Sequence, residues 1–392
     1  MSQVGEPVAK ATVDDAPYLK GAVTSLTFNG TIRVFRNKGV VSPPHWEDGA
    51  DLADTDYRQT WRPGSSGPGA YYSKRPAVVK VPGAGGDMQV KVIVTIAESK
   101  NVSGNGRLIG VLGTLTIEGE CPTGAGTHTV MARITNMPDE IGWYRGNIVW
   151  GLEVESAQMS IPLGASFAEL FAILDTPLQP AFAVGVWVEA LRLACEEARV
   201  VGVPLSDKPM AAARVVKYCF NDHGLFYDCT SGAPAYGCGG YGGTFKLESY
   251  IKQTAIFANC YDQAGAIQVL AGCVGVHLTW IYLDPFGYIN LTRLLGWHVD
   301  GLCNSPFFDF DISRMYVPQF DPTRTAFGNH AFCEYGGRVF DACAKPHLGS
   351  ADRAGYCREG IDSDLRLYNV ARGWIPGSPL LFRPSAGVTA VS

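Results

Sequence analysis

The sequence predicts an α+β protein in which an all-β, sandwich-like domain precedes a domain of helices and antiparallel sheet. Residues 22–155 contain β-rich runs, several with the period-two alternation of half-buried strands. Helical periodicity begins near Ser160, and β-rich runs return after residue 276. This order is typical of an α+β chain, and 392 residues with 46% apolar side chains are enough for two domains.

The first part of the chain divides into a short arm and a β domain. We predict a flexible arm over residues 1–20 and a sandwich-like domain over residues 21–158. Clusters of Gly, Pro, Asn and Asp separate the predicted strands, as expected of short strands joined by turns. The strands are predicted at residues 24–35, 89–96, 108–117, 128–134 and 147–154.

Residues 159–392 are predicted to form the second domain. Four helices are expected at residues 165–174, 182–201, 209–220 and 246–258. A further helix begins at Cys260 and ends at Gly272 or Gly275, where a glycine is a plausible stop. Strands follow at residues 277–283, 297–303, 330–335, 338–343 and 366–370.

Composition argues against two classes of partner. Charged residues make up 18% of the chain with a net charge of −5, and no basic cluster indicates a nucleic-acid site. The most apolar predicted helix, residues 182–201, carries five charged side chains, so we expect no membrane insertion. The polar N-terminus lacks the apolar segment of a signal peptide. We therefore expect a protein that is cytoplasmic at synthesis, with export by a dedicated secretion system left open.

The number and spacing of the cysteines argue against a complete disulfide framework. The chain has 11 cysteines at scattered spacings, and an odd number cannot all pair within one chain. We expect most of them to be small buried thiols rather than parts of a disulfide framework.

The last third of the chain carries a cysteine, a histidine and an aspartate in an order that suits amide chemistry. Cys260 begins a predicted helix, whose dipole and unpaired N–H groups favour a thiolate and a developing oxyanion. His330 begins the run His-Ala-Phe-Cys-Glu-Tyr, and Asp341 ends the run Arg-Val-Phe-Asp. A thiol, a base and a carboxylate that orients the base are the groups that an acyl-enzyme mechanism requires. The alternative interpretation is that all three are ordinary core residues.

Two glycines between the histidine and the aspartate predict a strand register. If Gly336 and Gly337 form a two-residue hairpin turn, Phe332 pairs with Asp341. His330 and Asp341 are then diagonal neighbours on one face of the sheet, with Cβ atoms about 7 Å apart or less. A slip of one residue would place Asp341 on the opposite face. The spacing therefore predicts a contact between the base and the carboxylate.

The segments around Cys260, His330 and Asp341 resemble the signature blocks of the transglutaminase-like superfamily. That pattern is a cysteine that begins a helix, a His-Ala-aromatic-x-Glu strand, and an aspartate on the next strand. The resemblance covers about residues 210–345. It implies a papain-like catalytic fold in which Cys260 is the nucleophile, His330 acts as general base and then acid, and Asp341 orients the histidine.

The sequence departs from this family pattern at three places. Phe340 stands where the family usually has tryptophan, and the usual proline after the aspartate is absent. The gap between Cys260 and His330 is longer than in compact bacterial members and implies an inserted segment around residues 307–325. No match to the calcium ligands of the animal crosslinking enzymes is found, so we predict no calcium dependence.

The predicted function is hydrolysis of an amide bond by a cysteine peptidase or amidase that forms a thioester with its substrate. Two alternatives remain open. One is a protein-glutamine acyltransferase or deamidase of the transglutaminase type, and the other is a non-catalytic binding protein on the same scaffold. The expected substrate is a protein or peptide, and the N-terminal β domain is expected to dock a partner. No cofactor is predicted.

Other residues form weaker candidates. Gln253 precedes Cys260 and is a candidate second donor to the oxyanion. The glycine-rich residues 237–243 are expected to shape a substrate groove. Trp280 and Trp297 are candidate walls of a water-free tunnel for an amine acceptor.

One group of side chains has the residue types of a zinc site without the spacing of one. Its members are Cys219, His223, Cys229 and Cys238. Their spacing matches no zinc template, so we favour buried thiols and predict no metal.

Overall fold

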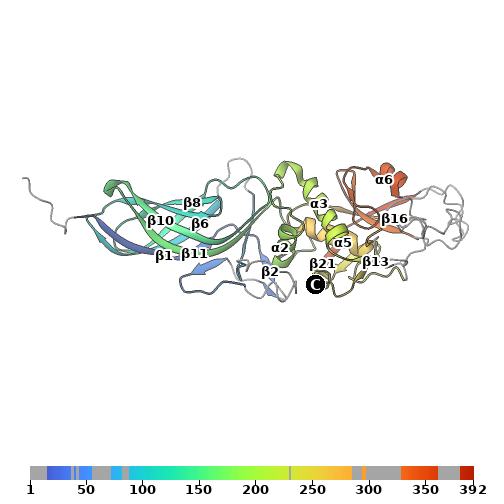
Figure 1. The fold of residues 1–392 in the computed structure, drawn as a ribbon, viewed down its shortest axis with the longest axis horizontal. Helices are drawn as coiled ribbons and strands as arrows, with labels where there is room; N and C mark the ends of the chain where they lie inside the picture. Colours follow the sequence, from blue (N-terminus) through green and yellow to red (C-terminus); the bar gives the residue numbers. More distant parts are fainter. Residues whose placement is uncertain are drawn as a thin grey trace, which may run out of the picture.

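The computed structural model describes residues 16–36, 39–40, 44–54, 72–81, 88–228, 231–284, 294–296, 328–360 and 380–392. Figure 1 shows two regions along the long axis of the molecule, one of long strands and one of helices and shorter strands. The first half of the chain forms the long strands and the second half forms the helical region. The predicted α+β class is confirmed.

Within the described residues, nine strands form one sheet in the order β4-β1-β6-β9-β8-β7-β10-β11-β5. The strands are β1 (Tyr18–Phe28), β4 (His45–Glu47), β5 (Ala77–Lys80), β6 (Met88–Lys100), β7 (Asn105–Leu112), β8 (Leu115–Pro122), β9 (Gly126–Ile134), β10 (Gly142–Val154) and β11 (Met159–Ile173). The pairs are antiparallel except for β11 and β5, which are parallel.

This sheet encloses its own core. Buried side chains alternate with more exposed ones along β6 from Met88 to Ile96, so that one face of the strand is apolar. The sheet curls until β1 contacts β11, although these strands are not hydrogen-bonded neighbours. Gly21 lies at this contact, where an added Cβ would be 3.3 Å from Leu163. The sandwich predicted from the sequence is therefore corrected to a single curled sheet.

Strand β11 corrects two further predictions. Residues 165–174 were expected to be helical and residue 158 was expected to end the β domain, yet residues 159–173 pair with β10 over nearly their whole length. The last part of β11 also pairs with β5 and is buried from Ala168 to Ile173. A strand buried on both faces is a continuous apolar run without alternation, which periodicity cannot distinguish from a helix. The β domain therefore extends to Ile173.

A short helix and a small sheet follow the β domain. Helix α2 (Val188–Glu196) comes directly after β12 (Val186–Trp187), which pairs with β2 (Val34–Arg36), and β2 pairs with β3 (Gly39–Val40). The helix is shorter than the predicted residues 182–201, because residues 180–183 form turns and the chain turns again after Glu197.

A buried ion-pair network joins α2 to the curled sheet. The guanidinium of Arg192 contacts Glu169 of β11 at 2.6 Å and Asp54 at 2.8 Å, and it donates to the backbone oxygen of Ser73. Trp143 Nε1 also donates to Glu169, at 3.1 Å. Because Arg192 and Glu169 are fully buried, each charge depends on the other for its solvation.

The helical region contains a second sheet. Within the described residues this sheet has five strands in the order β19-β18-β17-β16-β20. They are β16 (Thr279–Asp284), β17 (His330–Tyr335), β18 (Arg338–Asp341), β19 (His347–Leu348) and β20 (Leu381–Ser385). Two strand pairs complete the region, β13 (Phe226–Tyr227) with β15 (Phe257–Ala258) and β14 (Gly242–Phe245) with β21 (Gly387–Val391).

Helix α5 (Cys260–Gly272) lies at the centre of this region. Its residues are buried except for Tyr261, and it contacts β17, α2 and α3 (Lys208–Lys217). A helix that is apolar on all sides needs such surroundings. The predicted helix from residue 246 is shorter in the structure, where α4 spans Leu247–Ile251. Helix α6 (Arg353–Gly360) was not expected, and it packs on β18.

Several predictions fall on residues that the structure does not describe. Residues 1–15 of the predicted arm are outside the described residues, whereas residues 18–20 belong to β1. The strands predicted at residues 297–303 and 366–370 and the inserted segment around residues 307–325 are also outside them. Among the described helices, none has the length and apolar character that crossing a bilayer would need.

Candidate active site

Cys260 is the first residue of α5, and the residue before it caps the helix. Asn259 Oδ1 accepts hydrogen bonds from the N–H groups of Tyr261 at 3.0 Å and Asp262 at 3.1 Å. The Asp262 carboxylate accepts the N–H of Asn259 in return, at 3.2 Å. This capping box sets the start of the helix at Cys260. The cap does not use the Cys260 N–H, which therefore lies at the positive end of the helix beside its own thiol.

The β17–β18 hairpin has the register that its two-glycine turn predicts. Gly336 and Gly337 have φ values of +56° and +73°, which suit a type I′ turn. Cys333 pairs with Phe340 across the hairpin, as that turn requires. The register places His330 and Asp341 at the end of the hairpin that is distant from the turn.

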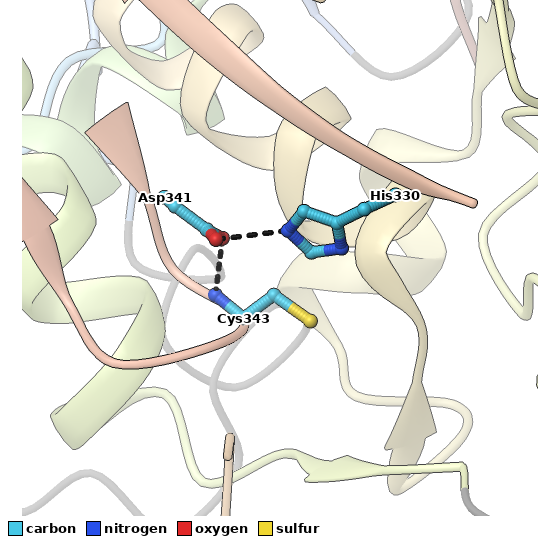
Figure 2. Close-up of side chains that lie close together, drawn as sticks. All are labelled: His330, Asp341 and Cys343. Atoms are coloured by element: carbon cyan, nitrogen blue, oxygen red, sulfur yellow. Dashed lines mark hydrogen bonds and ion pairs between the residues drawn. The ribbon is translucent and has the colours of Figure 1, made fainter. Parts of the chain in front are cut away.

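His330 and Asp341 contact one another as the sequence predicts. His330 Nε2 donates to Asp341 Oδ2 at 2.9 Å, and the residues are 2% and 1% exposed. The Cys343 N–H donates to the other carboxylate oxygen at 2.7 Å, as Figure 2 shows. The hydroxyl of Tyr356 in α6 donates to Oδ2 at 2.8 Å. Three donors therefore hold the carboxylate in one orientation toward the imidazole.

The third predicted residue, Cys260, interacts with the same imidazole. Cys260 acts on the imidazole through a hydrogen bond and through its charge, and both raise the pKa of His330. Burial by itself lowers the pKa of His330, but the Asp341 charge and the hydrogen bonds to Asp341 and Cys260 outweigh it and raise the pKa to about 10. The Asp341 carboxylate therefore stabilises the protonated form of the imidazole.

Tyr227 adds a group that the sequence prediction missed. This residue of β13 is 6% exposed, and its backbone N–H donates to Leu295. Burial and then the nearby charges of Cys260 and Cys343 raise the pKa of the Tyr227 phenol well above its usual value. A neutral hydroxyl thus lies within electrostatic range of the Cys260 thiol.

Neither Tyr227 nor Tyr356 has a recognisable signal in the sequence. The chain has 17 tyrosines, and these two stand in segments without a motif. Tyr356 reaches the site only because α6 packs on β18, and Tyr227 only because β13 pairs with β15 just before Cys260. Both contacts depend on tertiary packing.

Cys343 brings a second thiol to the site. One donor atom each from His330, Asp341 and Cys343 lie within 4.8 Å of one another, and all three residues are buried. These residue types suit a soft divalent metal. Both oxygens of Asp341, however, already accept hydrogen bonds from protein donors, and one nitrogen of His330 is one of those donors. The arrangement is therefore better suited to orienting an imidazole than to binding a metal ion.

Gln253 is bonded elsewhere in the structure. Its side-chain amide donates to the backbone oxygen of His223, and its own backbone has a positive φ of 53° after α4.

The suggested zinc residues do not meet as a ligand set within the described part of the chain. Both ring nitrogens of His223 are hydrogen-bonded, one to the Tyr218 hydroxyl at 2.7 Å and one to the backbone oxygen of Tyr250 at 3.0 Å. Cys219 and Cys238 are buried free thiols, and Cys229 is outside the described residues. The interpretation as buried thiols agrees with these contacts.

Of the two tryptophans expected to line a tunnel, the structure describes Trp280. Trp280 is fully buried and donates through Nε1 to the oxygen of Gly240 at 2.8 Å, so it anchors the glycine-rich loop. Trp297 is outside the described residues.

A surface groove lies away from this site. It is an open groove of about 690 Å³ near the C-terminal ends of α2 and α3, and its walls carry three basic and three acidic side chains. None of Cys260, His330 and Asp341 lines it. The mixed charges give no preference for a ligand, and we base the functional assignment on the thiol–imidazole–carboxylate geometry instead.

Comparison of the sequence with models of known protein families and with characterised proteins finds no match. The functional interpretation therefore depends on the residues of the site and their contacts.

Proposed function

We propose that the chain is a cysteine-dependent amide-bond hydrolase, a peptidase or amidase with a transglutaminase-like, papain-type catalytic domain. The observation that carries the proposal is the buried ion pair of His330 and Asp341, hydrogen-bonded to the thiol at the capped start of α5. The thiol, the imidazole and the carboxylate come from separate segments of the chain. Acyl transfer requires a thiol beside a base and a carboxylate that orients the base.

The proposed resting state is a Cys260 thiolate paired with a His330 imidazolium. The thiolate attacks the carbonyl carbon of the substrate amide, and a C–S bond forms while the carbonyl oxygen becomes an oxyanion. The Cys260 N–H at the helix start and the Tyr227 hydroxyl are the proposed donors to that oxygen. His330 then gives its proton to the leaving nitrogen, the C–N bond breaks, and a thioester remains.

Water completes the proposed cycle. His330, now neutral, accepts a proton from water as the oxygen attacks the thioester carbon. The C–S bond breaks, the acid product leaves, and the Cys260 thiolate and His330 imidazolium are restored. Asp341 keeps the ring oriented and stabilises its positive charge in both halves of the reaction.

Hydrolysis is favoured over amine transfer by the position of Trp280. Amine transfer needs a water-free passage to the thioester, and aromatic side chains are suited to line one. Trp280 is fully buried and bonded to Gly240, so it does not offer an accessible wall. Docking of a partner by the N-terminal β domain remains a prediction.

Limited labelling of the native protein with iodoacetamide near pH 6 tests the proposal without a substrate. We expect fast modification of Cys260, located by mass spectrometry, and its loss in His330→Ala. His277→Ala is the matched control, because His277 is exposed and bonds only through Nε2 to Thr176 in the described structure. Its labelling should equal that of the native protein.

Slow labelling that spreads over several cysteines and is indifferent to His330 would contradict the proposal and favour a binding protein. Incubation with glutamine-containing peptides separates the enzymatic alternatives. Cleaved backbone bonds indicate a peptidase, whereas released ammonia with or without incorporation of an amine indicates an acyltransferase or deamidase.

A further inference from the structure

Tyr241 stands exposed at the tip of an anchored turn near the site. Gly239 and Gly242 exchange two backbone hydrogen bonds, of 2.8 and 3.0 Å, which close a tight turn around Gly240 and Tyr241. Trp280 Nε1 donates to the Gly240 oxygen at 2.8 Å and attaches the turn to the sheet. The Tyr241 side chain is nevertheless 53% exposed. A large aromatic side chain held on a fixed turn in water is typical of a binding surface.

The turn packs on tyrosines that adjoin the nucleophile. The ring centroids of Tyr241 and Tyr282 are 4.7 Å apart with a tilt of 34°. A Cβ added to Gly240 would lie 2.7 Å from the Tyr282 ring and 3.5 Å from the hydroxyl of Tyr261. Tyr261 follows Cys260 directly, and the strand of Tyr282 pairs with the strand that begins at His330. The absence of a side chain at Gly240 therefore allows the turn to pack on Tyr282 and Tyr261, and the charge of Cys260 acts on both of these hydroxyls.

The charged side chains near these two rings do not favour a ligand of one charge over the other. Arg383 lies opposite Tyr282 on the neighbouring strand β20, and Asp284 lies two residues further along β16 on the same face. Both are close enough to act on the Tyr282 hydroxyl, with opposite effects. The partly exposed rings of Tyr241 and Tyr282 are then the feature that distinguishes the surface.

We propose that Tyr241 and Tyr282 form a subsite for an aromatic side chain of the substrate, within three residues of the amide that Cys260 attacks. The inference depends on the proposed function and adds a substrate class to it. Aromatic pairs contribute stabilisation beyond the area that they bury, so the substrate ring packs against the face of Tyr241. Gly240 and the turn hydrogen bonds keep that face in place without a substrate.

A library of proteome-derived peptides provides the test, because mass spectrometry reads the residues on both sides of each cut. We expect Phe, Tyr and Trp to be enriched at one of the three positions on either side of the cut bond. For a peptide pair that differs only by Phe or Gly at that position, kcat/KM should differ about tenfold. The preference should fall to about twofold or less in Tyr241→Ala and persist in Tyr241→Phe.

Two controls separate failure of this inference from failure of the proposed function. Labelling of Cys260 by iodoacetamide should be unchanged in Tyr241→Ala, because this small reagent does not need the subsite. Tyr18→Ala removes another exposed tyrosine, 47% accessible and in β1, and should leave the aromatic preference intact. Cuts without aromatic enrichment, or enrichment that survives Tyr241→Ala, would overturn the subsite alone. Slow labelling of Cys260 would overturn both, whereas fast labelling without any cuts would overturn the subsite and the peptidase assignment.

Discussion

The protonation of His330 depends on the two groups that act on its ring. Asp341 accepts from Nε2 at 2.9 Å, and Cys260 contributes a hydrogen bond and a charge that also raise the pKa of the ring. The pKa of the imidazole is raised to about 10 although the ring is fully buried. Such a perturbed histidine is typical of functional sites, although structural ion pairs produce similar shifts.

The raised pKa of His330 predicts an alkaline loss of stability. The folded-state pKa of about 10 is above the unfolded value of 6.5. The contribution of His330 to the free energy of unfolding is therefore complete below pH ~6.5 and is lost as pH rises through ~10. We expect His330→Gln to remove a pH-dependent contribution on the order of 3 kcal/mol. Urea unfolding between pH 6 and 10.5 measures the free energy of unfolding of both proteins. The same pH dependence in the native protein and in His330→Gln would contradict the prediction.

Tyr356 is expected to act as a positioning residue through Asp341. Its hydroxyl donates to the oxygen that also accepts from His330, and its ring lies 6.3 Å from the His330 ring. Removing one donor from a buried carboxylate costs about 1–2 kcal/mol. Tyr356→Phe should therefore lower the Cys260 labelling rate about 5- to 20-fold and shift its pH profile, while secondary structure is retained. Tyr335→Phe, at the turn end of the same hairpin, should change neither.

At the level of elements, the start of α5 determines where the thiol stands. The helix cannot begin earlier, because Asn259 has an extended backbone and its side chain is bonded to the first turn. The Asn259 amide also donates to the oxygen of Gly232, at 2.9 Å, which joins the helix start to the preceding loop. The backbone of Cys260 is therefore positioned by the helix cap.

Loss of this cap should affect stability and reactivity together. We expect Asn259→Ala to lower the free energy of unfolding by about 1–2 kcal/mol and to slow labelling of Cys260. Asn259→Ser restores a side-chain acceptor at the cap position and should recover most of both. Denaturant unfolding and timed iodoacetamide labelling are the measurements. Normal labelling in Asn259→Ala would show that the cap does not position the thiol.

An ion pair between Arg353 of α6 and Glu334 of β17 holds the helix to the β17–β18 hairpin. Arg353 Nε and its terminal nitrogen donate to the two oxygens of Glu334, at 2.6 and 2.9 Å. Glu334 fastens α6, and α6 in turn supplies Tyr356 to Asp341.

At the scale of the whole molecule, the two regions are joined through a buried charge. Arg192 of α2 contacts Glu169 of the curled sheet and Asp54, which lies in the chain between β4 and β5. None of these side chains is more than 2% exposed. Removing the arginine would leave two buried carboxylates without their cation.

Arg192→Met should therefore destabilise the protein by about 3–5 kcal/mol, measured by thermal or urea unfolding. Arg107→Met removes an exposed arginine from β7 that contacts Glu118 and Glu153, and should cost less than about 1 kcal/mol. A small effect of Arg192→Met would mean that the regions are held together mainly by apolar packing.

The elements that the sequence predicted correctly are those with strong local signals. The capped start of α5 at Cys260 and the two-glycine hairpin are encoded within a few residues of the features they determine. The hairpin register follows from turn length alone, so the His330–Asp341 contact was predictable from spacing. By contrast, β11 lacked a local signal, because burial on both faces removes the alternation that marks a strand.

From the sequence alone follow a cysteine at a helix start, the histidine–aspartate pair and the α+β class, since each arises from local geometry or from spacing. The distant groups that surround them follow from tertiary packing. Tyr227, Tyr356 and the turn that carries Tyr241 reach the site through pairing and packing of separate elements. Such contacts depend on side-chain volume and on the curl and register of whole sheets, and no periodicity along the chain records them.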